Sequence, residues 1–166
     1  MSRRRGAGET PALPDLSCAC ASARRVARLL TSVYDRALRD AGIDAPQFAM
    51  LATIANAGPC TQAELGRLHA LDKSTTSRNL TVLHKAGWID FSGTDDAREW
   101  SVMLTPSGTR QVTRAQAAWQ RAQDEIRRGM TATQWSAMFD SFRAVNQAAG
   151  AVQIKRATKA RPTAGR

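Results

Sequence analysis

The sequence predicts a mainly helical protein with a single small β-hairpin. Two observations carry this prediction. Apolar residues recur at the three-to-four-residue spacing of helices over most of the chain between residues 17 and 149. The pattern becomes strand-like, with aromatic and β-branched residues, only between residues 88 and 104. A length of 166 residues and a hydrophobic content of 43% fit one globular domain with a real core.

The first predicted helix covers about residues 17–40, with apolar side chains on one face, and Gly42 is a typical residue to end it. A second helix begins near Asp44, where an N-cap residue precedes an early proline and a glutamine. Gly58-Pro59 ends that helix.

Two short helices follow. The sequence Thr61-Gln-Ala-Glu64 is a capping box, in which two side chains satisfy each other's backbone N–H groups, and it begins a short helix that carries Leu65 and Leu68. Asp72 caps the next helix. The predicted buried stripe of that helix is Thr76, Leu80, Leu83 and Gly87.

The hairpin is predicted from strands at residues 88–91 and 99–104, with a turn-forming segment at 92–98. Thr105-Pro106 then begins a long helix that reaches about Arg128. A second capping box, Thr131-Ala-Thr-Gln134, begins a final helix that we expect to end near residue 149. Residues 1–16 and 150–166 lack apolar periodicity, and we expect them to be flexible tails.

The net charge of +10 favours a polyanionic partner, either nucleic acid or an anionic membrane surface. The charge is unevenly distributed: residues 150–166 hold five cations and no acid, whereas residues 60–100 hold five cations against six acids. A long apolar segment is absent from the sequence, so we expect a soluble cytoplasmic protein without a membrane partner.

The order helix, turn, helix, hairpin predicts a winged helix-turn-helix over about residues 46–104. The second helix of such a pair presents short polar side chains to base edges in the major groove of double-stranded DNA, and a wing arginine, here Arg98, can enter a minor groove. Ser/Thr-rich helix starts are also common on surfaces that bind nothing. The candidate DNA-binding residues are Thr61, Gln62, Lys73, Ser74, Thr75, Ser77, Arg78, Asn79 and Arg98.

Several motifs resemble the MarR family of bacterial transcriptional regulators, over about residues 20–149. They are Thr61-Gln-Ala-Glu-Leu65, Leu71-Asp-Lys-Ser-Thr-Thr-Ser-Arg-Asn-Leu80, Leu83-His-Lys-Ala-Gly-Trp88, and Asp96-Ala-Arg98 followed by Leu104-Thr-Pro-Ser-Gly108. The resemblance implies a homodimer built from the end helices, about residues 17–40 and 105–149, that binds a pseudo-palindromic operator, usually as a repressor released by a small ligand or by oxidation. Thr76 stands where the family more often has an apolar residue, which predicts looser local packing.

The end helices support a dimer independently, because they carry more apolar surface than a small winged helix can cover. The alternative is that these residues pack within one monomer. They are Leu29, Leu30, Val33, Trp135, Phe139 and Phe142.

Cys18 and Cys20 are the candidate redox switch, because a helix N-terminus and the nearby Arg24 and Arg25 favour a thiolate. Inert thiols are the alternative. A candidate pocket for a small aromatic effector is Tyr34, Phe48 and Trp119, for which core packing is the simpler interpretation.

Other function classes find little support. The sequence lacks a closed set of metal ligands, a cofactor motif and the common catalytic motifs, so we expect neither a metal site nor an enzyme. The remaining alternative is a basic architectural protein that coats DNA without reading its sequence.

Overall fold

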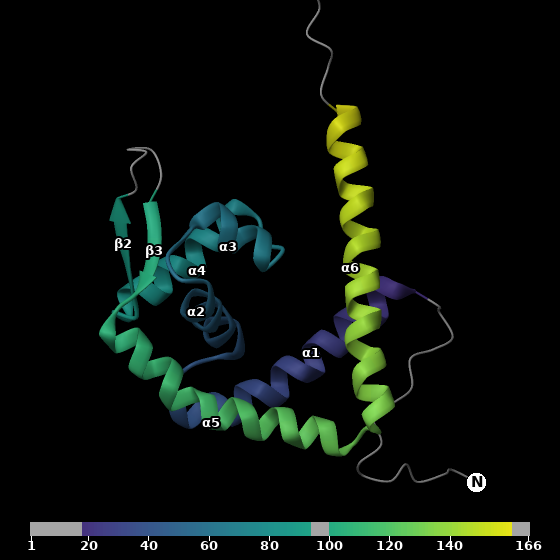
Figure 1. The fold of residues 1–166 in the computed structure, drawn as a ribbon, viewed down its shortest axis with the longest axis horizontal. Coiled ribbons are helices and arrows are strands. Elements are labelled where there is room, and N and C mark those ends of the chain that lie inside the picture. Colours follow the sequence, from purple (N-terminus) through teal and green to yellow (C-terminus); the bar gives the residue numbers. More distant parts are fainter. Residues whose placement is uncertain (1–17, 94–99, 161–166) are drawn as a thin grey trace, which may run out of the picture. The chain divides into compact units, whose positions relative to one another are not determined.

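The computed structural model describes the backbone of residues 18–93 and 100–160, with side chains as far as Val152 (Figure 1). Its elements confirm the mainly helical class with a small antiparallel sheet. Chain contacts divide it into two units, residues 1–120 and 121–166, which are described separately. The elements are α1 (Ala19–Leu38), η1 (Arg39–Ala41), α2 (Ala45–Ala57), β1 (Cys60–Thr61), α3 (Gln62–Leu68), α4 (Lys73–Lys85), β2 (Ile89–Gly93), β3 (Trp100–Leu104), α5 (Pro106–Arg128) and α6 (Ala132–Ala160).

The helix starts are where the capping residues predict them. Asp44 accepts a hydrogen bond from the backbone of Gln47 at 2.8 Å, and the Gln47 side chain accepts one from the Asp44 backbone at 3.2 Å. Thr61 and Glu64 form the same reciprocal box at α3. Thr131 and Gln134 do so at α6. Each box satisfies backbone donors that a helix start otherwise leaves unpaired.

The core of the first unit lies between α1, α2, α3, α4, the first part of α5 and the sheet. Its fully buried side chains are mostly leucines at helical spacing, and each element contributes at least one of them. They include Leu38, Leu51, Leu65, Leu80, Leu83, Ile89 and Val102. Leu68, in contrast, is 64% exposed, because α3 ends there and Ala70 turns the chain with a φ of 51°. Both Leu65 and Leu68 lie in α3, as predicted, but of the two only Leu65 is buried.

The sheet has three antiparallel strands in the order β1-β3-β2. Cys60 of β1 pairs with Val102 of β3, and the hairpin register pairs Ile89 with Leu104 and Gly93 with Trp100. The sequence predicts the hairpin but not β1, since a two-residue strand is too short to show alternation. The predicted turn, including Asp96 and Arg98, lies mostly outside the described residues.

The hairpin and α5 meet at a close joint. The backbone N–H of Thr105 donates to the Trp88 carbonyl at 3.1 Å, and the Thr105 hydroxyl donates to the Gly87 carbonyl at 2.7 Å. The same hydroxyl oxygen accepts from the backbone of Gly108 at 3.0 Å, which caps α5. A Cβ atom added to Gly108 would lie 1.9 Å from the Trp88 carbonyl oxygen. Only glycine fits at this position.

A polar clamp ties α5 to the turn between α1 and α2. Gln111, which is only 5% exposed, donates to the Ala41 carbonyl at 2.7 Å. The Arg114 guanidinium donates to the same carbonyl and, at 2.6 Å, to the side-chain oxygen of Gln111. Two long side chains thereby fix the corner at which the chain enters α2.

Helix α6 continues to Ala160, so the prediction that the helix ends near residue 149 and that residues 150–166 form a flexible tail is wrong for residues 150–160. Alanine, glutamine and lysine in this segment favour helix, and the first proline after it is Pro162. Within α6, the rings of Trp135 and Phe139 make an edge-to-face contact with centroids 5.3 Å apart. Among the described helices, none combines the length and apolar character that crossing a membrane requires.

Candidate DNA-binding interface

Helix α4 has a buried stripe and an exposed polar face. Thr76, Leu80 and Leu83 are buried as predicted, which fixes the rotation of the helix about its axis. The prediction that Gly87 continues this stripe is wrong, because α4 ends at Lys85 and Gly87 is exposed with a φ of 72°. The same rotation exposes four of the candidate residues at the start of the helix and leaves Thr75 and Asn79 half-buried. The exposed four are Lys73, Ser74, Ser77 and Arg78.

A short polar chain orders the first turn of α4. The Asp72 carboxylate accepts from the backbone and the hydroxyl of Thr75, both at 2.8 Å. Arg78 donates to the Thr75 hydroxyl oxygen at 3.3 Å. These bonds from Thr75, with a smaller contribution from the charge of Arg78, hold the pKa of Asp72 below its usual value, so the carboxylate stays ionised near neutral pH. The hydroxyl of Thr75 thus links the N-cap to the arginine.

The positioning role of Thr75 is absent from the sequence prediction, which treats this residue only as a DNA contact. The signal that points to it is the spacing of three residues between Asp72 and Thr75, and again between Thr75 and Arg78, because side chains three apart are neighbours on a helix.

Helix α3 supports α4 from behind. The side-chain amide of Gln62 donates to the Lys73 carbonyl at 3.2 Å, and Thr61 is engaged in its capping box. Thr76 is fully buried, and its hydroxyl donates to the Asp72 carbonyl at 2.8 Å. A Cβ added to Gly66 would lie 3.1 Å from that hydroxyl oxygen. The expectation of loose packing at Thr76 is wrong, because a small residue on each helix lets the two approach closely.

The wing is joined to α4 at its base. The ring of Phe91 in β2 lies 5.2 Å from the ring of His84, centroid to centroid, and the His84 side chain lies 3.7 Å from an Asp90 carboxylate oxygen. Figure 1 shows β2 and β3 side by side, running away from this base. The predicted minor-groove residue, Arg98, lies outside the described residues.

A buttressed helix with an exposed polar face, next to a β-hairpin, defines a winged-helix protein of the DNA-binding class. Residues 41–99 match the model of the MarR family. The chain belongs to this family, which is a family of transcriptional regulators and not of enzymes. It is a DNA-binding regulator.

Solved structures support the assignment. The chain is 32% identical to the Mycobacterium tuberculosis transcriptional regulator MosR in complex with DNA, with a TM-score of 0.75, covering 82% of this chain and 98% of that one. The fold is also that of a mutant MarR from Escherichia coli complexed with operator DNA, at 23% identity and a TM-score of 0.71, covering 76% and 91% of the two chains. PcaV from Streptomyces coelicolor, in complex with its natural ligand, is 23% identical with a TM-score of 0.74, covering 84% and 99%. The comparison with curated proteins gives no match.

The three cysteines differ in environment. Cys18 and Cys20 are exposed at the start of α1, where Cys18 is the N-cap residue. Cys60 is buried in the sheet, and burial together with the nearby Glu64 carboxylate raises the pKa of its thiol. An oxidant in solution therefore reaches Cys18 and Cys20 first. Within the part of the chain that the structure describes, no group of three or more potential ligands is placed to hold a metal ion.

The three candidate effector residues pack in the core of the first unit. The rings of Phe48 and Trp119 lie 6.1 Å apart between centroids, and Phe48 is buried. Tyr34 and Trp119 are partly buried against the same core. Burial also raises the pKa of Tyr34, so its hydroxyl stays protonated. This arrangement agrees with the simpler interpretation, which is core packing.

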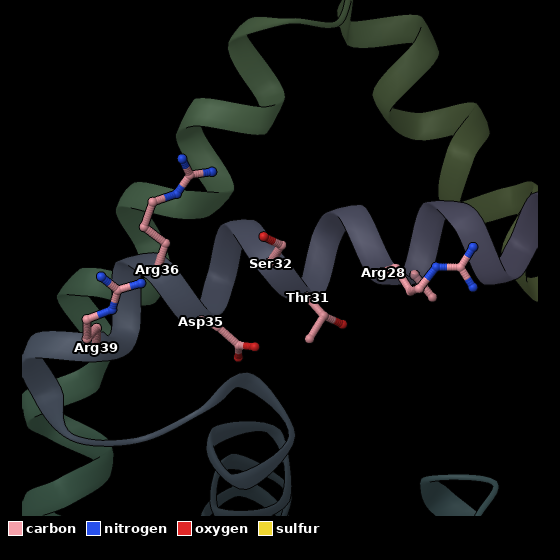
Figure 2. Close-up of a pocket in the computed structure, with 7 residues that line it drawn as sticks. Arg28, Thr31, Ser32, Asp35, Arg36 and Arg39 are labelled. Carbon is pink, nitrogen blue, oxygen red and sulfur yellow. The ribbon is translucent and has the colours of Figure 1, made fainter. Parts of the chain in front are cut away.

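A groove of about 580 Å³ runs along α1, and three arginines line it: Arg28, Arg36 and Arg39. Figure 2 shows that their side chains do not converge: Arg36 projects from the opposite side of α1 to Thr31 and Asp35. Asp35 accepts a hydrogen bond from the backbone of Ala45 at 2.8 Å, which attaches α1 to the start of α2. The groove is a basic surface and not a formed anion site.

Proposed function

We propose that this protein is a homodimeric repressor that binds a pseudo-palindromic operator through two copies of α4. The observation that carries the proposal is the exposed row of Ser74, Ser77 and Arg78 on a helix whose rotation is fixed by its buried stripe. Such a row suits the major groove, in which arginine binds guanine O6 and N7 and serine binds either a base or a phosphate. Arg98 is proposed to contact the minor groove.

The dimer is supported by apolar side chains that one chain leaves exposed. On α1 these are Val26 and Leu29. On α6 they are Phe139, Phe142 and Val145. Self-association covers such surfaces, and two-fold symmetry places the two copies of α4 about 34 Å apart, one turn of DNA. A Phe142→Glu variant should then be monomeric by sedimentation and should bind DNA more weakly.

Sequence reading is tested by selecting duplexes from a random library with the wild-type protein. Arg78→Ala should bind the selected duplex no better than a random duplex of the same length. Lys85→Ala is the matched control, because it removes the same charge from the last turn of the same helix. It should lower both affinities slightly and keep the preference. An Arg78→Ala variant that retains the wild-type preference refutes the proposed reading face.

The release signal is proposed to be oxidation of Cys18 and Cys20, which are both exposed. Peroxide should dissociate the wild-type protein from its operator and leave the Cys18→Ser/Cys20→Ser variant bound. If the variant is released at the same peroxide concentration, these thiols are not the sensor. In that case a small aromatic ligand bound near Tyr34, Phe48 and Trp119 is the alternative signal, and a ligand-induced rise in melting temperature would detect it.

A basic architectural protein would bind all duplexes equally. The charge of residues 150–166 suits that role, so this segment and the reading face should be tested separately. Substituting the five cations of this segment by glutamine should weaken binding to selected and random duplexes alike and reduce the salt dependence. If the wild-type protein enriches no sequence at all, the architectural alternative is favoured.

A further inference from the structure

Trp100 is an unusually exposed aromatic residue on the wing. It is the first residue of β3 and is 60% exposed, whereas the other three tryptophans of the chain are half-buried. Its cross-strand partner is Gly93, which has no side chain to cover it. Leaving so large an apolar ring in water is unfavourable unless it serves a contact.

The register shows which way the ring faces. Directly paired residues share one face of a sheet, and the pairs Ile89–Leu104, Phe91–Val102 and Gly93–Trp100 therefore lie on a common face. Ile89 and Val102 are buried, so this is the face that packs against the core. Phe91, on the same face, contacts His84 of α4. Trp100 extends this surface beyond the core, on the side toward α4.

The geometry of DNA indicates what Trp100 would contact. When α4 lies in the major groove and the wing reaches the adjacent minor groove, the sugar-phosphate backbone that separates the two grooves passes between them. A residue on the α4 side of the wing, past the last core contact, faces that backbone. The Phe91–His84 contact joins this surface of the wing to the last turn of α4, the helix that carries the proposed reading face.

The charge of the region also favours an uncharged contact. Residues 60–100 carry one more acid than they carry cations, so this part of the protein has no net attraction for a polyanion and depends more on contacts that need no charge. We propose that Trp100 is a DNA-contacting residue whose indole packs on the deoxyribose of the strand between the two grooves. This inference rests on the proposed binding of α4 in the major groove, and it adds to that complex a contact that does not depend on DNA sequence.

The test uses the full chain with the selected duplex and a random duplex of equal length. Trp100→Ala should weaken both complexes about tenfold, the lower end of the cost of removing an aromatic contact to nucleic acid. Trp100→Phe should lose less. The slope of affinity against salt should not change, because no ionic contact is removed. The matched control is Met103→Ala, since Met103 is an exposed apolar residue on the opposite face of β3, and it should bind like the wild type.

Tryptophan fluorescence provides a second measurement that does not depend on a stable alanine variant. Acrylamide quenching of the wild-type protein, minus that of Trp100→Phe, reports on Trp100, and a saturating duplex should shield it. Wild-type affinity in Trp100→Ala, or an unshielded Trp100 in the complex, overturns the inference while leaving the proposed function intact. A wild-type protein that binds no duplex overturns both.

Discussion

The motif Leu104-Thr-Pro-Ser-Gly108 requires glycine at its last position for a steric reason. The variant Gly108→Ala tests that requirement. The new Cβ would lie 1.9 Å from the oxygen and 2.8 Å from the carbon of the Trp88 carbonyl, both distances shorter than real Cβ contacts. Both atoms belong to the backbone and cannot rotate away. The first turn of α5 must therefore move away from the start of the wing.

The cost follows from what that movement breaks. Overpacking a rigid site costs about 1–3 kcal/mol. The two hydrogen bonds from Thr105 to Trp88 and Gly87 contribute about 0.5–1.5 kcal/mol each, and separation of α5 from the wing weakens them. Alanine returns about 0.5–1 kcal/mol as a better helix former. We expect a net loss of about 3 kcal/mol, which is a large part of the stability of a typical domain.

Urea unfolding at one fixed protein concentration measures this loss, since a dimer would make the midpoint depend on concentration. Gly150→Ala is the control. Within the described chain an added Cβ at Gly150 meets nothing within 4 Å, so this variant should gain about 0.5–1 kcal/mol. A Gly108→Ala protein within about 1 kcal/mol of the wild type would refute the argument, because it would mean that the joint yields easily.

Three further predictions concern the polar side chains of Gln111, His69 and Thr75. Gln111→Ala removes one donor to the Ala41 carbonyl and the side-chain oxygen that accepts from Arg114. The free energy of unfolding, measured with urea, should fall by about 1–3 kcal/mol. An unchanged urea midpoint would contradict the proposed clamp. Burial holds the pKa of His69 below 6.5, so the unfolded chain binds its proton more readily, and stability should fall as the pH drops below about 6.5. His69→Gln should abolish that fall and His84→Gln should retain it, whereas identical pH profiles for the two variants would contradict the assignment. Thr75→Val removes the hydroxyl that links Asp72 to Arg78, and it should reduce operator preference less than Arg78→Ala does. The control in the same binding assay is Thr81→Val, which loses only a hydrogen bond to the Ser77 carbonyl.

Local chemistry made the helix starts predictable. A cap at Asp44, Thr61, Asp72 or Thr131 acts within three residues, so the sequence contains the whole interaction. Helix ends were harder to predict. Gly150 is helical in the structure, and the helix continues past it to Ala160. Gly42 and Gly58 stop helices where the backbone adopts a positive φ, and residue identity alone does not show where that happens.

The candidate site shows the same division. The buried stripe of α4 was predictable from spacing, and with it the exposed face that contains Ser74 and Arg78. Strand β1 and the clamp from Gln111 to Ala41 were not predictable, because each joins segments far apart in the sequence. The close approach of Gly66 and Thr76 was missed for the same reason. Such contacts depend on tertiary packing, which overrides local propensity.

The acidic residues between 60 and 100 explain why the net charge of this segment is a poor guide to its function. Bonds from Thr61 hold the pKa of Glu64 below its usual value, as bonds from Thr75 do for Asp72, so both carboxylates remain ionised at neutral pH while they cap α3 and α4. These negative charges belong to the scaffold that fixes the reading face. Because they offset nearby cations, the salt dependence of binding should arise mainly from residues 150–166, and sequence preference should arise from contacts that do not require net charge. A variant without the cations of residues 150–166 should then bind with a shallow salt slope and still distinguish its operator, whereas a protein that binds DNA only through its positive charge would not distinguish it.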